Sequence, residues 1–125
     1  MSLNYRTNRL TVLALLPLFL LVVSLSAKAQ TPNPQRGHRL FDQICAKCHG
    51  ADGSKTTSVG KAVKARDLRS PEVQDLSDSE IYNQVADGTT NMPPFSPRYR
   101  KDQIDSLVLY VRELGKSYPG VSKQN

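Results

Sequence analysis

The sequence predicts an all-α fold in one small domain. Three segments space their apolar residues like the buried face of a helix, and no run alternates apolar and polar residues as a half-buried strand would. Residues 30–125 are long enough for a single domain with one core. The three segments are taken below in chain order.

The first helix is expected just before a pair of cysteines. Its apolar face follows the i, i+3, i+4, i+7 spacing and consists of Gly37, Leu40, Phe41 and Ile44. Glycine in a helix costs about 1 kcal/mol relative to alanine, so Gly37 needs a steric reason. We expect a second helix to pack closely against it, around Tyr110.

The second helix is expected to begin at Ser77. Ser77 and Glu80 form a Ser-x-x-Glu capping box, and Gly88 ends the helix. The third helix lies near the C-terminus, and Gly115 stands where it should stop. Its apolar face consists of Ile104, Leu107, Val108, Val111 and Leu114.

The N-terminus has the features of a secretory signal peptide. Two arginines precede a leucine-rich run over residues 10–25, and a small-x-small sequence ends at Ala29. We therefore expect a signal peptide over 1–29, cleavage after it, and a periplasmic domain over 30–125. The alternative is an uncleaved membrane anchor through residues 10–27.

The charge balance does not favour a nucleic-acid partner. The formal net charge is +6, and residues 1–29 hold three of the 17 basic residues and none of the 11 acidic ones, so the remainder carries +3. Its charges are mixed in sign along the chain.

The most informative motif is Cys45-Ala46-Lys47-Cys48-His49, which matches the attachment signature for c-type haem. Each thiol can add to a vinyl group of the porphyrin to form a thioether, and His49 can then bind the iron. Three other interpretations are a structural zinc site, a redox-active dithiol and two buried free cysteines. Zinc would need His38 as a fourth ligand, with Cys48 and His49 adjacent on the backbone. A redox dithiol would be expected in a βαβ context.

The second axial ligand of the iron is expected to be Met92. It is the only methionine in residues 30–125, and a pair of prolines follows it. The competing ligand is His38. It lies on the helix that leads into the motif and cannot easily reach the opposite face of the ring.

Taken together, these motifs resemble class I cytochrome c. The resemblance covers about residues 35–116 and rests on the residues Gly37-x-x-Leu40-Phe41, the motif of Cys45 to Gly50, Asp67-Leu68, Gly88-x-x-x-Met92-Pro93-x-Phe95 and Tyr110-Val111-Arg112-x-Leu114. It implies three to five helices around one covalent haem c, with the N- and C-terminal helices crossing near Phe41 and Tyr110. It also implies that Leu68 lines the haem pocket.

The chain departs from this family at one point. Several members carry a proline about ten residues after the histidine, whose carbonyl accepts a hydrogen bond from that histidine, but residues 56–61 contain none. The hydrogen-bond partner of His49 therefore stays open. The candidates for binding the haem propionates are Lys61, Lys64 and Arg66.

With histidine and methionine on the iron, no coordination position is open to a substrate, so we expect an electron carrier and not an enzyme. The alternatives are a haem-bearing subunit of a larger oxidoreductase and a catalytic or gas-binding haem protein. The expected partners are redox proteins, with contact to membranes only through them unless the signal segment is retained. Acidic patches on those partners would face the basic residues Lys47, Lys55, Lys61, Lys64, Arg66, Arg69, Arg98, Arg100 and Lys101.

Overall fold

A computed structural model describes residues 30–119. This part of the chain contains helices and no strand, which confirms the all-α fold. The helices are α2 (Pro34–Ile44), α3 (Ala46–His49), α4 (Ser58–Ala62), α5 (Pro71–Gln74), α6 (Asp78–Asp87) and α7 (Lys101–Gly115). The three longer ones, α2, α6 and α7, are those expected from the sequence. The signal peptide expected over 1–29 lies outside the described residues.

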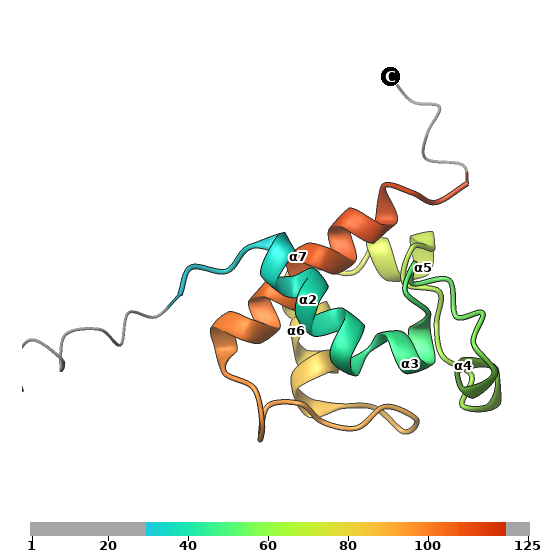
Figure 1. Cartoon of the computed structure of the whole chain (residues 1–125), viewed down its shortest axis with the longest axis horizontal. Helices are drawn as coiled ribbons and strands as arrows, with labels where there is room; N and C mark the ends of the chain where they lie inside the picture. The colour runs from blue at the N-terminus through green and yellow to red at the C-terminus, as the bar shows by residue number, and fades with distance from the viewer. Residues whose placement is uncertain (1–29, 120–125) are drawn as a thin grey trace, which may run out of the picture. The chain divides into compact units, whose positions relative to one another are not determined.

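The first and last described helices, α2 and α7, cross each other (Figure 1). Gly37 is buried at the crossing, and a Cβ atom there would overlap the carbonyl oxygen of Ser106 and lie 2.9 Å from Cβ of Tyr110. The expected close contact at Gly37 is therefore confirmed. The backbones can approach this closely only because Gly37 has no side chain.

The core lies along this crossing. Its largest fully buried apolar side chains are Phe41, Ile104 and Leu107. The ring of Tyr110 packs edge-on against Phe41, with centroids 5.2 Å apart, as the family resemblance implied. Ser106 is also fully buried, and its hydroxyl donates to the Asp102 carbonyl at 2.7 Å, so this polar group has a partner.

Helix α6 begins and ends as the sequence predicts. The amide of Glu80 donates to the Ser77 hydroxyl at 3.2 Å, and the amide of Ser77 donates to the Glu80 carboxylate at 2.7 Å. These two bonds form the capping box. Gly88 is the C-cap that follows the last helical residue, Asp87; its φ of 76° suits glycine and turns the chain into the next loop.

Side chains near the C-terminal half of α7 hold the α5–α6 segment. Arg112 donates to the Gln74 carbonyl at 2.7 Å and to the Leu76 carbonyl, and it pairs with Asp78 at 2.8 Å. In return, the side-chain amide of Gln74 in α5 donates from Nε2 to the carbonyls of Leu68 and Val111. None of the described helices is long and apolar enough to cross a membrane.

Candidate functional site

The two cysteines and the histidine lie on one tight turn between α2 and α3. Helix α2 ends at Ile44, and Cys45 connects it to α3. The amides of Cys48 and His49 both donate to the Cys45 carbonyl, at 3.1 and 3.0 Å. This turn places both thiols and the imidazole against the same cavity.

The cavity has a volume of about 360 Å³, within the usual range for a small-molecule or cofactor site. Cys45, Cys48, His49 and Met92 all line it, so the structure brings together the four residues predicted from sequence. Leu68 lines it as well, as the resemblance implied. The rest of the wall is mostly apolar and includes Ile44, Val63, Val73, Leu76, Ile81, Phe95 and Val111.

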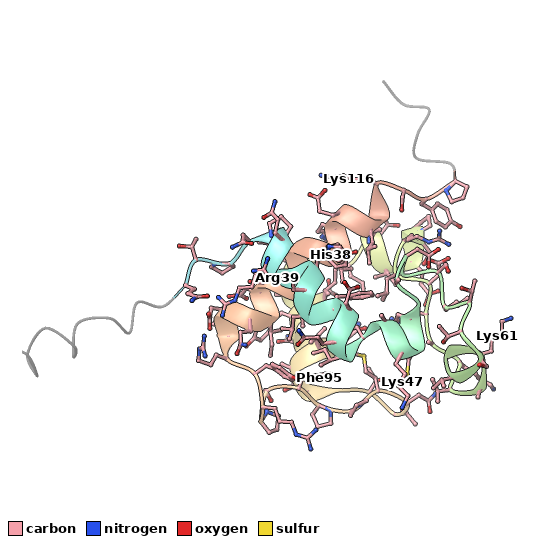
Figure 2. All side chains as sticks on the ribbon, viewed as in Figure 1. His38, Arg39, Lys47, Lys61, Phe95 and Lys116 are labelled. Atoms are coloured by element: carbon pink, nitrogen blue, oxygen red, sulfur yellow. The ribbon has the colours of Figure 1, made fainter. Side chains whose placement is uncertain are left out.

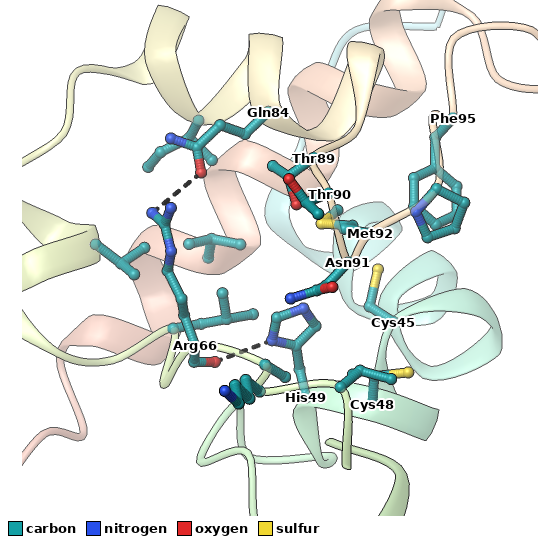
Figure 3. A pocket seen from close by; sticks show the side chains of 18 of the residues that line it. Cys45, Cys48, His49, Arg66, Gln84, Thr89, Thr90, Asn91, Met92 and Phe95 are labelled. Atoms are coloured by element: carbon teal, nitrogen blue, oxygen red, sulfur yellow. Dashed lines mark hydrogen bonds between the residues drawn. The ribbon is translucent and has the colours of Figure 1, made fainter. Parts of the chain in front are cut away.

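The partner of His49, which the sequence left open, is the backbone carbonyl of Arg66. It lies 3.0 Å from Nδ1 of His49 (Figure 3). A carbonyl only accepts, so Nδ1 carries the proton and Nε2 keeps its lone pair for a metal. Burial lowers the pKa of His49, while this hydrogen bond acts in the opposite direction. No sequence motif marked Arg66 for this role, because any residue has a carbonyl.

Met92 comes from the loop after α6. The amide of Thr89 donates to the Met92 carbonyl at 2.8 Å, and the amide of Met92 donates back to the Thr89 carbonyl at 3.2 Å. The amide of Phe95 bonds to the last turn of α6, at the Val85 carbonyl. Figure 3 shows the Met92 sulfur and the His49 ring reaching the cavity from different elements. Paired backbone bonds and the prolines thus fix the loop that carries the sulfur.

His38 lies away from the cavity. Its ring stacks on Tyr110, with centroids 4.7 Å apart, and Nε2 is 3.4 Å from the Asp42 carboxylate. Its side chain is about half exposed. His38 therefore meets neither the cysteines nor Met92. Among the described residues, no group of three or more histidine, cysteine or acidic side chains could hold a metal ion, which argues against the zinc interpretation.

The environment of the cysteines also argues against a redox-active dithiol. Burial, with a further contribution from Cys48, raises the pKa of the Cys45 thiol to about 12. Redox-active cysteines have lowered pKa values, because the thiolate is the reactive form. The β-strands that such a motif accompanies are missing from residues 30–119.

Helix α4 packs against the backbone of the cysteine motif at Cys48, a contact that was not among the expectations from the sequence. The Thr57 hydroxyl donates to the Cys48 carbonyl at 2.9 Å and accepts from the amide of Gly60 at 2.9 Å. A Cβ atom on Gly60 would overlap that carbonyl oxygen. A Thr-x-x-Gly sequence after the motif was the available signal.

These features fit a c-type haem. A large apolar cavity would take the ring, two thiols stand where vinyl groups could be captured, and an imidazole nitrogen and a thioether reach the cavity from different elements. No carboxylate lines the described cavity, so no buried negative charge opposes the propionates.

Comparisons with known proteins agree with this fit. The family model described as cytochrome c oxidase, cbb3-type, subunit III matches residues 32–111. The chain is 32% identical to cytochrome c6 of Nostoc sp. (strain PCC 7120) over 105 residues, covering 84% of this chain and 90% of that one. It is 35% identical to cytochrome c6 of Leptolyngbya boryana over 75 residues, covering 60% and 85%.

A solved structure is also similar. The c-type cytochrome KustC0563 superposes with a TM-score of 0.58 at 35% sequence identity, over 62% of this chain and 95% of that one. The all-α fold, the cavity and the matched sequences thus agree. The chain therefore belongs to the cytochrome c family: it is a small electron carrier with one covalently attached c-type haem, and it is not an enzyme.

Proposed function

We propose that this protein is exported and carries single electrons between redox proteins of the periplasm and its membrane. In this proposal Cys45 and Cys48 hold the haem through thioethers, and His49 and Met92 are the axial ligands of its iron. The single observation that carries it is that these four residues, from the α2–α3 turn and the loop after α6, line one cavity.

One-electron exchange between ferric and ferrous iron is the chemistry that the haem supplies when bound. The chain sets its conditions. The Arg66 carbonyl orients His49, and the mostly apolar wall would surround the bound ring with apolar side chains. A neutral thioether from Met92 favours ferrous iron and raises the reduction potential. If His49 and Met92 both bind the iron, no coordination position would be left for a substrate.

Visible spectra test the ligand set. The wild-type protein should show a sharp low-spin α-band when reduced and a weak far-red band from sulfur-to-iron charge transfer when oxidised. Met92→Ala should lose the far-red band, lower the potential and let carbon monoxide or cyanide bind. His38→Ala is the matched control and should leave the spectrum unchanged, because His38 lies outside the cavity. An unchanged spectrum in Met92→Ala would contradict the proposal.

The attachment residues have a separate test. The double variant Cys45→Ala/Cys48→Ala should contain no haem that survives acid-acetone extraction, because no thioether can form. Haem that stayed covalently bound would refute this attachment.

The signal peptide stays a proposal about residues outside the described part. The mass of the purified periplasmic protein should correspond to a chain that begins at Gln30. An intact N-terminus in the membrane fraction would instead support the anchor through residues 10–27.

A second candidate is a haem-bearing subunit of a larger oxidoreductase. The description of the matching family model, an oxidase subunit, favours it. The cytochrome c6 relatives favour a free carrier, since this chain covers most of their length. Size-exclusion chromatography of the native extract separates the two, because a subunit would elute with its complex.

Fewer of the nine basic residues are available for docking to acidic partners than the sequence suggested. Four of them have ion-pair partners: Arg66, Arg69, Arg100 and Lys101. Among the described residues, the others have no such partner; Figure 2 shows Lys47 and Lys61 on the outside of the molecule. Unpaired cations of this kind would steer an acidic surface toward the haem.

Small inorganic oxidants can test whether these basic residues attract anions, so no physiological partner needs to be known. Oxidation of the reduced protein by anionic ferricyanide should slow as salt rises, because screening weakens attraction over about 10 Å at 0.1 M salt. Lys47→Glu should weaken this dependence, and a cationic cobalt complex should show the reverse. A flat profile with ferricyanide would remove the docking proposal.

A further inference from the structure

The structure separates the three basic residues that the sequence offered as candidates for the haem propionates. Lys64 and Arg66 line the cavity, and Lys61 does not. Apart from the imidazole of His49 and the thiols of Cys45 and Cys48, these two carry the only ionisable side chains of the described wall, where the other polar residues are threonine, asparagine and glutamine. All formal positive charge at the cavity is thus placed on one short segment.

Lys64 has a backbone conformation that is unusual for its side chain. Its φ is 55°, in the left-handed region. It follows the end of α4, where the amide of Ala65 donates to the Gly60 carbonyl at 2.8 Å and the amide of Lys64 points to the Lys61 carbonyl at 3.3 Å. This is the Schellman arrangement, in which the left-handed position is usually glycine because glycine has no Cβ to clash. Helix capping therefore explains the conformation but not the lysine.

Lys64 is also free of competing partners. Within residues 30–119, its ammonium group has no hydrogen bond or ion pair. Arg66 is held in place instead: its guanidinium donates to Oε1 of Gln84 at 3.3 Å and lies 3.7 Å from the Glu72 carboxylate. Gln84 also lines the cavity. One cation is thus fixed at the wall and the other is available beside it.

We infer that Lys64 and Arg66 form the cationic side of the haem site and pair with its two propionates. A haem carries two carboxylates on neighbouring pyrrole rings, and two cations on alternate residues of one segment match that pair in charge and number. Because the same segment supplies the carbonyl that orients His49, one stretch of three residues binds the ligand ring and the propionate edge. The inference rests on the covalent haem and does not depend on which residue is the sixth ligand.

The test is the midpoint potential, measured by spectroelectrochemistry on the holoprotein. A cation beside a propionate opposes the ferric state, so Lys64→Gln should lower the potential. Lys61→Gln is the matched control, since it removes the same charge three residues away and outside the cavity wall. We expect the shift in Lys64→Gln to be severalfold larger, and Lys64→Arg should restore the wild-type potential. Equal shifts in Lys61→Gln and Lys64→Gln would overturn the inference.

Two further variants keep the result interpretable. Lys64→Gly should raise the thermal midpoint, because glycine suits the left-handed backbone, and still lower the potential. A potential unchanged in Lys64→Gly would contradict the inference even if the protein became more stable. Arg66→Gln should lower the potential while keeping the low-spin spectrum, since the bond to His49 comes from the backbone. If instead Met92 were not a ligand of the iron, the wild-type spectrum would lack the far-red band, so the two proposals fail in different measurements.

Discussion

The α2–α7 crossing and the cavity region are held together by different forces. At the crossing, long helices bury large apolar side chains such as Phe41, Ile104 and Leu107. Around the cavity, α3, α4 and α5 have only four or five residues each, and side-chain hydrogen bonds to backbone carbonyls hold α4 and α5 to the rest of the chain. Helices this short are not stable by themselves. The crossing is therefore a core made by the chain itself, whereas the short helices around the cavity depend on hydrogen bonds to the rest of the chain.

Both regions contain a buried glycine that packs against a backbone carbonyl oxygen, and this permits a direct comparison. Gly37 in α2 meets the Ser106 carbonyl, and Gly60 in α4 meets the Cys48 carbonyl. Both are buried, and a Cβ atom would overlap the facing oxygen in each case. Glycine-to-alanine substitutions at the two positions therefore compare how far each region can relax to accommodate an added methyl group.

We expect the largest effect from Gly37→Ala. The added methyl group forces apart two long helices that share the main core, so the free energy of unfolding should fall by about 3 kcal/mol or more. Guanidinium unfolding of the holoprotein, followed by circular dichroism, measures it. Gln43→Ala, at an exposed position of the same helix, should change stability by less than about 0.5 kcal/mol. A loss at Gly37 as small as that control would show that the crossing is not tightly packed.

The next effect is expected from Arg112→Met. This change leaves the carbonyls of Gln74 and Leu76 without their donor and releases the segment that forms one cavity wall. The cost should be about 2 kcal/mol, measured by the same unfolding method. Arg39→Met, on an exposed part of α2, is the control and should be nearly neutral. If both variants cost the same, the α5–α6 segment does not need this anchor.

A smaller loss of stability, about 1 kcal/mol, is expected from Gly60→Ala. The short helix α4 has no other fully buried residue and can shift outward. The shift should break the bond from Thr57 to the Cys48 carbonyl and change the haem environment. The far-red band should therefore move in Gly60→Ala and stay unchanged in Gly37→Ala protein that still folds. A Gly60→Ala loss equal to that of Gly37→Ala would mean that the two regions are equally rigid.

The smallest expected effect is the pH-dependent loss of stability in Asp67→Asn. The side-chain hydrogen bond from Arg69 is the main cause that lowers the pKa of Asp67, with an ion pair of 2.9 Å. A lowered pKa in the folded state stabilises the protein above about pH 4, and this contribution is lost as the pH falls further. Asp67→Asn should therefore cost less than about 1 kcal/mol at pH 7 and nothing near pH 2.

The pH series needs one control. Asp75→Asn changes an exposed carboxylate of the same segment and should leave the unfolding free energy nearly constant at both pH values. A difference between Asp67→Asn and the wild type that persisted at pH 2 would assign the effect to packing and not to charge.

Much of the fold and of the site could be predicted from the sequence, for local reasons. Helices α2, α6 and α7 are long and periodic; the caps of α6 at Ser77 and Gly88 and the end of α7 at Gly115 are marked by local features of the chain. The cysteines and His49 are contiguous, so their proximity needs no fold. Gly37 was informative because glycine is costly in a helix without a steric reason.

The sequence by itself determined which residue types line the cavity as candidate haem-binding groups and the periodicity of the three long helices. Only the tertiary structure decided which carbonyl orients His49, that α4 packs against Cys48, and that Lys64 and not Lys61 reaches the cavity. The physical reason is that backbone groups are alike at every residue. Which of them meet across loops depends on how the whole chain packs, and no local pattern records it.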